Sequence, residues 1–266
     1  MSVVVITGAA GGIGQAMARA WAAEGSRVAL LDLCAPTELA AELVAGGSEA
    51  LAIACDITDE AACDGAIAQV LGRWGQIDVL INNAGISHRS LFESTDPAVL
   101  RKVMEVNFFG AVNCTRSALP SLVHSGGQIV AISSVAGFGP LLGRTAYSAS
   151  KHAMHGFFDS LRTELAGRVG VLIVCPAYTD TALKSRALGA DGVPLGESTR
   201  NTIGALLQPD DVARSVLRAV RRRRRMLLLS PVAHASWWLS RFAPRVYARL
   251  MVRGQRAEFA SPTGSG

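Results

Sequence analysis

The sequence predicts an α/β fold in which a doubly wound parallel sheet of about seven strands carries helices on both faces. Three observations predict it. Short, nearly continuous apolar runs recur along the chain, as in parallel strands that are covered on both sides. Longer helical stretches separate these runs, and a glycine-rich turn joins the first run to the first helical stretch.

Six apolar runs rich in valine, isoleucine and leucine are the predicted strands. They are VVVIT (3–7), RVALLDL (27–33), EALAIACDI (49–57), IDVLINN (77–83), GQIVAISS (127–134) and VGVLIVCP (169–176). RMLLLSP (225–231) is the candidate for a last strand. Helices are expected between the runs, over 13–24, 59–74, 97–119, 147–166 and 209–221. Because strand and helix alternate throughout, the chain is expected to wind βαβ units into one sheet.

Length and composition fit a single domain. The chain has 266 residues, 50% of them hydrophobic, which is enough for one large core. Its apolar stretches are too short or too interrupted to span a bilayer, and no signal-peptide pattern follows Met1. The five cysteines lack C-x-x-C spacing and are expected to be reduced core residues: Cys34, Cys55, Cys63, Cys114 and Cys175. These features predict a cytoplasmic protein.

The turn after the first strand has the composition of a dinucleotide-binding loop. In VVVITGAAGGIGQAMARAW, Gly8, Gly12 and Gly14 permit a tight turn, close approach of a pyrophosphate, and close packing of helix on strand. The helix that follows offers its N-terminal N–H groups and positive dipole end to phosphates. Because strand, loop and helix occur in the required order, a dinucleotide site is favoured over a merely flexible turn.

Asp32 ends the second predicted strand, eighteen residues beyond Gly14. A carboxylate there can accept hydrogen bonds from the adenosine ribose hydroxyls, and it would repel a 2′-phosphate. No Lys or Arg lies between Gly8 and Gly14 to bind such a phosphate. NAD is therefore favoured over NADP, although Asp32 could instead serve as a helix N-cap in the strand–helix loop.

Tyr147 and Lys151 are four residues apart in a predicted helix, so both lie on one face. Removing a hydride from a secondary alcohol also requires removal of the hydroxyl proton. A free tyrosine, with a pKa of about 10, is too weak a base near neutrality, and a nearby ammonium favours the phenolate. The pair is therefore the candidate for proton transfer. Ser134 can donate a hydrogen bond to the oxygen on which charge develops.

Four motifs, in order along the chain, resemble those of the short-chain dehydrogenase/reductase family: T-G-x-x-x-G-x-G (7–14), NNAG (82–85), ISS (132–134) and YSASK (147–151). The resemblance covers about residues 1–231, which it identifies as a Rossmann-fold catalytic domain of the single-domain branch. We interpret 232–257 as a basic amphipathic extension of this domain. The tail, 258–266, is expected to be disordered.

The resemblance implies a role for each matching residue. Tyr147 corresponds to the general acid/base, Lys151 to its partner, and Ser134 to the serine that holds the substrate oxygen. Asn107 in VNFFG resembles the asparagine that fixes a proton-relay water behind the lysine. The implied cofactor-binding residues are Gly8, Gly12, Ile13, Gly14, Asp32, Leu33, Asp56, Ile57, Asn83, Ala84, Gly85, Tyr147, Lys151, Pro176, Thr179 and Thr181. The family usually has Pro-Gly where this chain has Pro176-Ala177, which leaves the backbone path of that loop open.

The implied function is that of an NAD-dependent oxidoreductase that interconverts a secondary alcohol and a ketone, with the cofactor exchanging the hydride. Two alternatives remain open: an NADP-dependent carbonyl reductase, and a non-catalytic dinucleotide-binding scaffold that uses the arginine-rich C-terminal segment. A scaffold has no need of a proton relay, so the four relay residues favour the enzyme. Family members commonly form homodimers or homotetramers, and a homo-oligomer is expected.

Apolar side chains around the expected site favour an apolar alcohol or ketone, such as a steroid, a retinoid or a long-chain compound. They are Val135, Phe138, Leu141, Leu142, Tyr178, Leu183, Leu188, Val193, Pro194 and Leu195. The alternative is that these residues pack only against the fold. Residues 178–208 are expected to form a mobile lid. His88 is either at the pocket edge or a loop histidine, and no carboxylate or cysteine pattern accompanies His152 and His155, so no metal is predicted.

The charges are distributed unevenly. Residues 212–256 contain twelve of the 26 basic residues and none of the 21 acidic ones. The run RRRRR (221–225) follows a predicted helix, where cations suit the negative end of the dipole. Without aromatic interleaving or a groove-reading motif it predicts no nucleic-acid partner.

Residues 237–253 carry a pattern of their own. Trp238, Phe242, Val246 and Leu250 recur at near-helical spacing, and arginines recur every four residues from Arg241 to Arg253. This predicts a basic amphipathic helix that Pro244 divides or starts. Such a helix can make peripheral contact with an anionic membrane, pack on the domain, or contact a second subunit, and the sequence leaves all three open.

Overall fold

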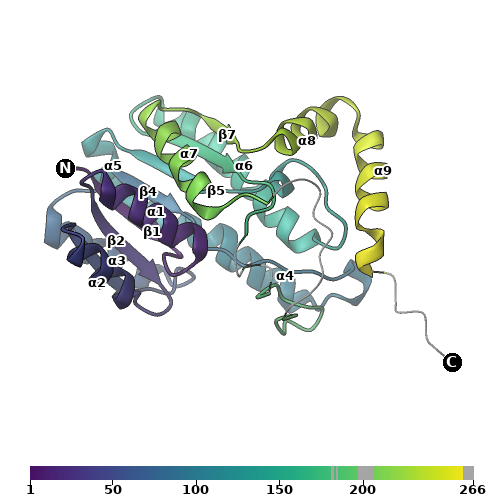
Figure 1. Ribbon diagram of the computed structural model, residues 1–266, viewed down its shortest axis with the longest axis horizontal. Coiled ribbons are helices and arrows are strands. Elements are labelled where there is room, and N and C mark those ends of the chain that lie inside the picture. The colour runs from purple at the N-terminus through teal and green to yellow at the C-terminus, as the bar shows by residue number, and fades with distance from the viewer. Residues whose placement is uncertain (181–182, 184, 197–205, 260–266) are drawn as a thin grey trace.

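The computed structural model describes residues 1–180, 183, 185–196 and 206–259 (Figure 1). In these residues, seven parallel strands form one sheet in the order β3-β2-β1-β4-β5-β6-β7. The strands are β1 (Val3–Thr7), β2 (Arg27–Asp32), β3 (Ala50–Ala54), β4 (Val79–Asn82), β5 (Gln128–Ile132), β6 (Gly170–Cys175) and β7 (Met226–Leu228). Each lies within a predicted apolar run, and the doubly wound fold is confirmed.

Helices lie on both faces of this sheet (Figure 1). They are α1 (Gly12–Ala23), α2 (Thr37–Ala45), α3 (Glu60–Trp74), α4 (Pro97–Met104), α5 (Gly110–Ser125), α6 (Thr145–Leu165), α7 (Pro209–Arg221), α8 (Pro231–Phe242) and α9 (Pro244–Gln255). Four predicted helices agree with α1, α3, α6 and α7 to within two residues. The short helix α2 falls outside the predicted ones.

The single helix predicted over 97–119 is wrong in two respects. A π-helical turn, Glu105–Phe109, separates α4 from α5. In addition, α5 continues through Pro120 and ends only at Ser125, where Gly126 takes a positive φ of 62°. A proline usually ends a helix, but a tertiary context that buries one face of the helix can retain it. Gly110 opens α5 against Ile57, where a Cβ would lie 2.5 Å from the isoleucine Cδ1.

Local signals explain where the other helices begin and end. The Asp59 carboxylate accepts hydrogen bonds from the N–H groups of Ala61 and Ala62 and so caps α3, which Gly75 ends in the left-handed conformation. Helix α7 has Pro209 at its first position, acidic residues in its first turn and arginines in its last. Both charge placements suit the helix dipole, as predicted for the arginines.

The core is divided by the sheet into two layers. Val3 and Val5 of β1 pack with α3, α5 and α6, whereas Val4 and Ile6 pack with α1, α2 and α7. This alternation follows from the two-residue period of a strand. It also explains why the strands are apolar at successive positions, since both faces are buried.

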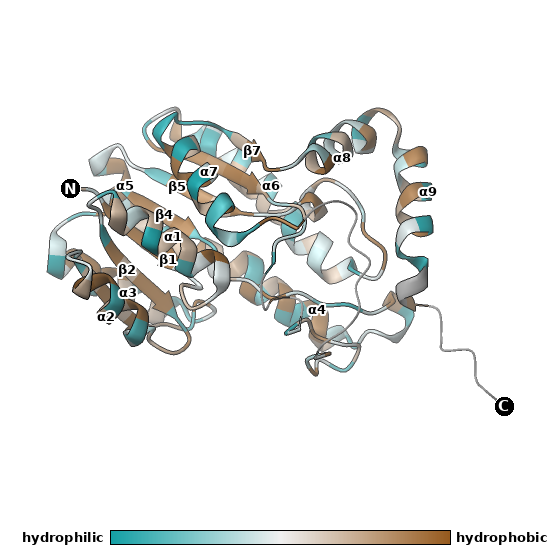
Figure 2. Cartoon of the chain, viewed as in Figure 1, coloured by the Kyte–Doolittle hydropathy of each residue, from teal (hydrophilic) through white to brown (hydrophobic). Residues whose placement is uncertain are grey.

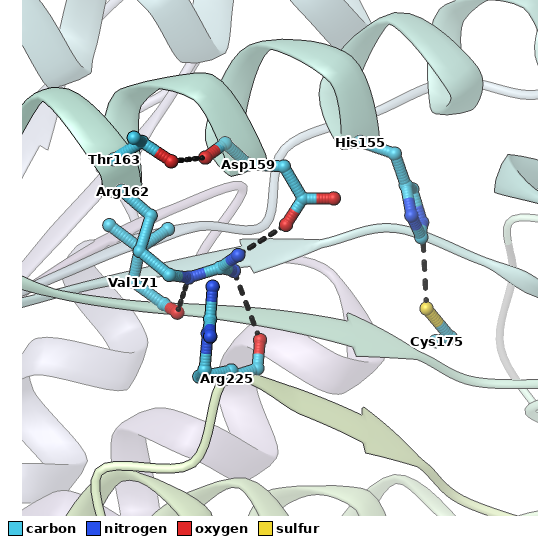
Figure 3. A network of polar contacts seen from close by, with 7 residues as sticks. All are labelled: His155, Asp159, Arg162, Thr163, Val171, Cys175 and Arg225. Carbon is cyan, nitrogen blue, oxygen red and sulfur yellow. Dashed lines mark hydrogen bonds and ion pairs between the residues drawn. The ribbon is translucent and has the colours of Figure 1, made fainter.

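A network of polar contacts fixes the C-terminal half of α6 to the sheet (Figure 3). The Arg162 guanidinium donates to the carbonyl oxygens of Val171 at 3.0 Å and Arg225 at 3.1 Å, and it pairs with Asp159. One side chain thereby joins α6 to β6 and to the start of β7. Its side chain is only 14% exposed, so these bonds are poorly screened by water.

The cysteines are all free, in agreement with the sequence prediction, but the expectation that all lie in the core is wrong for Cys34, which is exposed. The Sγ atoms of Cys63 and Cys114 lie 3.6 Å apart between α3 and α5. Their contact and the burial of the site raise the pKa of Cys63 to about 12. Cys63 therefore stays a protonated core residue.

The chain after β7 forms two helices rather than one. Pro244 starts α9, as the sequence allowed, and Ala243 breaks the path from α8. Both helices lie at the end of the molecule remote from α2 and α3 (Figure 1). Residues 260–266 of the expected tail lie outside the described residues. Among those described, no helix is both long enough and apolar enough to cross a bilayer.

Substitution of Arg162 by Lys should lower the free energy of unfolding by about 1.5–3 kcal/mol, because one ammonium cannot span the carbonyl oxygens of Val171 and Arg225 while keeping the ion pair with Asp159. Urea unfolding measures the loss. Arg214→Lys is the control, since Arg214 is 62% exposed and pairs only across one helical turn with Asp211. Equal losses of unfolding free energy in the two variants would show that the Arg162 network stabilises the fold no more than an exposed ion pair does.

Candidate functional site

A cavity of about 670 Å³ lies at the carboxyl ends of the strands. The strand order reverses at β1, whose neighbours are β2 on one side and β4 on the other. In a doubly wound sheet, ligands bind in the crevice that this reversal creates. The residues that follow β1, β2, β4, β5 and β6 all contribute to the cavity wall.

The glycine loop forms part of the cavity wall. Gly8 has a φ of +63°, and a Cβ there would lie 2.7 Å from the Ala84 Cα. A Cβ on Gly14 would collide with the Gly8 carbonyl oxygen and come within 2.9 Å of the Ala9 Cα. No side chain of the described residues caps the N-terminus of α1. Its N–H groups and dipole are therefore available to an anion.

Hydrogen bonds lock the ends of β1 and β4 together beside this loop. The Thr7 hydroxyl oxygen accepts from the N–H groups of Asn83 and Ala84, both at 3.1 Å. In return, the Asn83 amide donates to the carbonyl oxygens of Thr7 at 2.9 Å and Gly8 at 3.0 Å. Thr7 is a positioning residue that the sequence analysis did not single out.

Two carboxylates also line the cavity. Asp32 accepts from the N–H of Ala10 with one oxygen and from the N–H of Leu33 with the other, each at 2.9 Å. Asp56 accepts from the N–H and hydroxyl of Thr58. These bonds orient both carboxylates while leaving lone pairs for a ligand. The structure thus brings Asp32, Leu33, Asp56 and Ile57 into the same cavity as the glycine loop.

Tyr147 and Lys151 enter the cavity from the first turns of α6. The Lys151 Nζ lies 5.7 Å from the centroid of the Tyr147 ring and donates to the Ile132 carbonyl oxygen at 2.9 Å. Burial lowers the pKa of Lys151 to about 8. Ser134, at the end of β5, lines the same cavity, and its hydroxyl oxygen accepts from the N–H of Ala136.

Asn107 does not line the cavity but lies behind it, fully buried in the π-helical turn. Its side chain accepts from the N–H of Ile86 at 2.7 Å and donates to the Ile86 carbonyl and the Ser150 hydroxyl, both at 2.9 Å. A Cβ on Gly85 would lie 3.1 Å from the Asn107 Oδ1 and 3.7 Å from the Lys151 Nζ. The side chains of Asn107 and Lys151 therefore both approach Gly85, where a larger residue would crowd the Asn107 amide.

The loop after β6 forms another part of the cavity wall. The Val135 N–H donates to the Pro176 carbonyl oxygen at 3.2 Å, and Ala177 has no positive φ, so this path needs no glycine. Thr179 lines the cavity, and its hydroxyl is buried without a hydrogen-bond partner in the described part of the chain. Thr181 lies outside the described residues.

These features fit a dinucleotide. The glycine cradle is a space that a Cβ would fill, and the buried Thr179 hydroxyl needs a polar partner. Of the described residues, no group of His, Cys, Asp and Glu is arranged to hold a metal ion.

The prediction of the apolar lining is right for some residues and wrong for others. Four line the cavity, namely Val135, Leu141, Tyr178 and Leu183. The remaining six do not line it within the described structure, namely Phe138, Leu142, Leu188, Val193, Pro194 and Leu195. Leu188 packs into a small separate core, Val193 is 59% exposed, and Phe138 packs edge-to-face on His155. Spacing along the chain could not distinguish these environments.

His88 is not at the cavity edge. Its ring is fully buried, and burial lowers its pKa to about 4, so it is neutral. Its neighbours Ser87 and Arg89 line the cavity instead. Other charged lining residues that the sequence analysis missed are Lys102, Glu105, Arg144 and Arg186.

The C-terminal helices contribute a wall that no local motif predicts. Val232 and Ser236 of α8 and Tyr247 and Met251 of α9 line the cavity. They lie about a hundred residues after the candidate catalytic residues in the sequence, so only the path of the folded chain brings them there.

Together, the fold and the cavity define a class of protein: a dinucleotide-dependent oxidoreductase with one doubly wound domain. Residues 2–190 match the family model for short chain dehydrogenase, and the chain belongs to this family. It is 37% identical over 268 residues to dehydrogenase/reductase SDR family member 7B of Bos taurus, a match that covers 97% of this chain and 82% of the relative.

Two solved structures with similar folds carry dinucleotides. A short-chain dehydrogenase/reductase from Burkholderia phymatum, in complex with NAD, has a TM-score of 0.80 and 25% identity, covering 92% of this chain and 94% of its own. An alcohol dehydrogenase from Thermococcus sibiricus, complexed with 5-hydroxy-NADP, has a TM-score of 0.74 and 25% identity, covering 85% and 95%. Similar folds therefore accept either type of dinucleotide.

Substitution of Gly14 by Ala should weaken NADH binding by about tenfold or more, because the new methyl group collides with the backbone of the glycine loop. Fluorescence titration measures the affinity. Gly72→Ala is the matched control, since a Cβ at this helical position has nothing within 4 Å. Unchanged affinity in Gly14→Ala would show that the loop does not hold the pyrophosphate.

The buried Lys151 predicts a pH dependence of stability. Its pKa falls from 10.5 in the unfolded chain to about 8 in the fold, so below about pH 8 it is charged in both states and its burial costs the most. Between about pH 8 and 10.5 the folded protein binds fewer protons than the unfolded one, and the free energy of unfolding should rise with pH. Urea unfolding at both ends of this window should show a larger rise for the wild type than for Lys151→Met. Equal changes would contradict the lowered pKa.

Proposed function

We propose that the protein is an NAD-dependent oxidoreductase that interconverts a secondary alcohol and a ketone, and that its substrate is apolar. One observation carries the proposal. The Tyr147 phenol, the Lys151 ammonium and the Ser134 hydroxyl line the same cavity as the glycine loop and Asp32. Proton-transfer groups and a dinucleotide cradle in one cavity are what alcohol oxidation requires.

The bound cofactor supplies the hydride acceptor or donor. The residues of the chain handle the proton and the oxygen. Tyr147 takes the hydroxyl proton during oxidation and returns it during reduction. The Lys151 ammonium, held by the Ile132 carbonyl, stabilises the phenolate form. Ser134 donates a hydrogen bond to the reacting oxygen, on which negative charge develops.

Asn107 acts as a positioning residue in this proposal. It holds the backbone of Ile86 and the hydroxyl of Ser150, which lies next to Lys151 on α6. Asn107 and Lys151 both approach Gly85, so the asparagine orders the backbone and the helix turn beside the lysine. This arrangement supports a role in a proton relay behind the lysine.

The choice of NAD rests on Asp32. The carboxylate lies at the end of β2, where its charge opposes a 2′-phosphate. One structural relative binds NAD and another an NADP derivative, so the relatives do not distinguish the two cofactors. The proposal of NAD therefore rests on the charge of Asp32. The cofactor-binding set comprises the residues predicted above.

The apolar substrate is supported by apolar side chains in the wall of the cavity. Val135, Leu141 and Leu183 line it from the body, and Val232 and Met251 line it from the C-terminal helices. An apolar alcohol or ketone would displace water from these side chains, which is favourable.

Substitution of Tyr147 by Phe should lower kcat by about 10²–10⁴-fold, since the proton acceptor is lost, while the affinity for NADH is retained. Turnover of a panel of secondary alcohols and ketones, followed by NADH absorbance, is the measurement. Tyr178→Phe is the comparison: it removes another phenol of the cavity wall, with its hydrogen bond from Gln255, and should lower kcat far less. A wild-type protein that binds NADH but turns over nothing in the panel would favour the scaffold.

The wild type should bind NADH more tightly than NADPH, and Asp32→Asn should narrow the difference by about tenfold. The asparagine removes the charge, and its one carbonyl oxygen can keep the hydrogen bond from the Ala10 N–H while the bond from the Leu33 N–H is lost. Fluorescence titration with both cofactors measures the ratio. Tighter binding of NADPH by the wild type would overturn the assignment of NAD.

A further inference from the structure

Helices α8 and α9 are fixed to the body through one face. Ala233 and Ser236 of α8 and Tyr247 and Gln255 of α9 are buried. The Tyr247 ring fills the space above Gly139, where a Cβ would lie 2.5 Å from the phenol oxygen. These contacts fix the position of the two helices on the body. Their opposite face therefore has a defined orientation toward solvent.

Gln255 links this helix pair to the cavity wall. Its side chain accepts from the Leu142 N–H at 2.8 Å and donates to the Tyr178 hydroxyl at 3.3 Å. Leu141 and Tyr178 both line the cavity. The inner face of the pair is therefore continuous with the candidate substrate site.

The outer face of the pair exposes large apolar side chains. Trp238 is 57% exposed, Phe242 73%, Val246 47% and Leu250 46%. The Trp238 and Phe242 rings stack with centroids 5.1 Å apart, so they present one aromatic surface to solvent. A contiguous patch of exposed apolar side chains marks an interaction site, whereas single exposed apolar residues are ordinary.

Arginines accompany these apolar side chains. Arg241, Arg245, Arg249 and Arg253 are exposed, and residues 231–256 contain no Asp or Glu. Figure 2 shows hydrophilic and hydrophobic bands alternating along α9. The outer face is thus cationic and apolar at the same time.

The three occupants that the sequence left open make different demands on this face. The body already packs on the inner face, and it leaves the outer apolar side chains exposed. A symmetric contact with a second copy would bring two sets of arginines together with no acid from α8 or α9 between them, which is unfavourable. An anionic lipid surface accepts both the apolar side chains and the arginines.

We propose that the outer face of α8 and α9 docks on an anionic lipid surface, with Trp238, Phe242, Val246 and Leu250 at the level of the headgroups. The wall of the cavity would then lie directly behind the lipid contact. Entry of an apolar substrate from the bilayer follows if the proposed function holds, but the docking itself does not depend on it.

Co-sedimentation of the full chain with vesicles tests the docking. The probes are vesicles of phosphatidylcholine alone and of phosphatidylcholine with about 30% phosphatidylserine. Binding to the anionic vesicles is expected, with little binding to the neutral ones. The double variant Arg245→Glu and Arg249→Glu should reduce partitioning by about tenfold or more, and Phe242→Ser should also reduce it.

A matched control changes the same charge elsewhere. Arg222→Glu with Arg224→Glu alters two exposed arginines in the turn between α7 and β7, outside α8 and α9, and should retain most of the binding. NADH affinity, measured on every variant, shows that each remains folded. A protein that binds vesicles but turns over no substrate would contradict the proposed function and leave the docking proposal standing.

Three results would overturn the docking proposal. The first is no binding of the wild type to anionic vesicles. The second is an equal loss in both double variants, which would indicate general electrostatic attraction. The third is dissociation of an oligomer by Phe242→Ser in sedimentation velocity, which would assign the face to a second copy of the chain.

Discussion

The close approach of β1 to β4 at their carboxyl ends is the constraint on which the site depends. Thr7 and Asn83 exchange four hydrogen bonds with the backbone around them, and Gly8 lies so near Ala84 that no side chain fits between. This contact occurs where the strand order reverses. The reversal creates the crevice, and the contact brings its two sides close together. The glycine loop can then present backbone N–H groups, rather than side chains, to a pyrophosphate.

Helix α6 carries both stability and chemistry. Arg162 fixes its C-terminal half to β6 and to the start of β7, while its first turns hold Tyr147 and the buried Lys151. Burial of an ammonium is unfavourable, and the hydrogen bond to the Ile132 carbonyl offsets only part of that cost. An anchor at one end of the helix therefore helps to keep a buried charged group in place at the other.

The C-terminal helices show how one amphipathic sequence can serve two surfaces. Tyr247 and Gln255 face the body and extend the wall of the cavity, whereas Phe242 and Leu250 face outward beside the arginines. A pattern of apolar and basic residues indicates that a helix has two different faces. The pattern does not identify what each face contacts, because the protein interior and a lipid surface both accept the same apolar side chains.

The sequence alone predicts the strands, the glycine turn, Asp32 at the end of β2 and the spacing of Tyr147 and Lys151, because each is encoded within one short stretch whose periodicity or composition suffices. Other features arise between distant stretches. The π-helical turn that buries Asn107, the separate core that takes Leu188, and the helix pair that closes the cavity depend on which surfaces meet after the chain has wound around the sheet. Packing between elements is a property of the whole path, and no single window of sequence contains it.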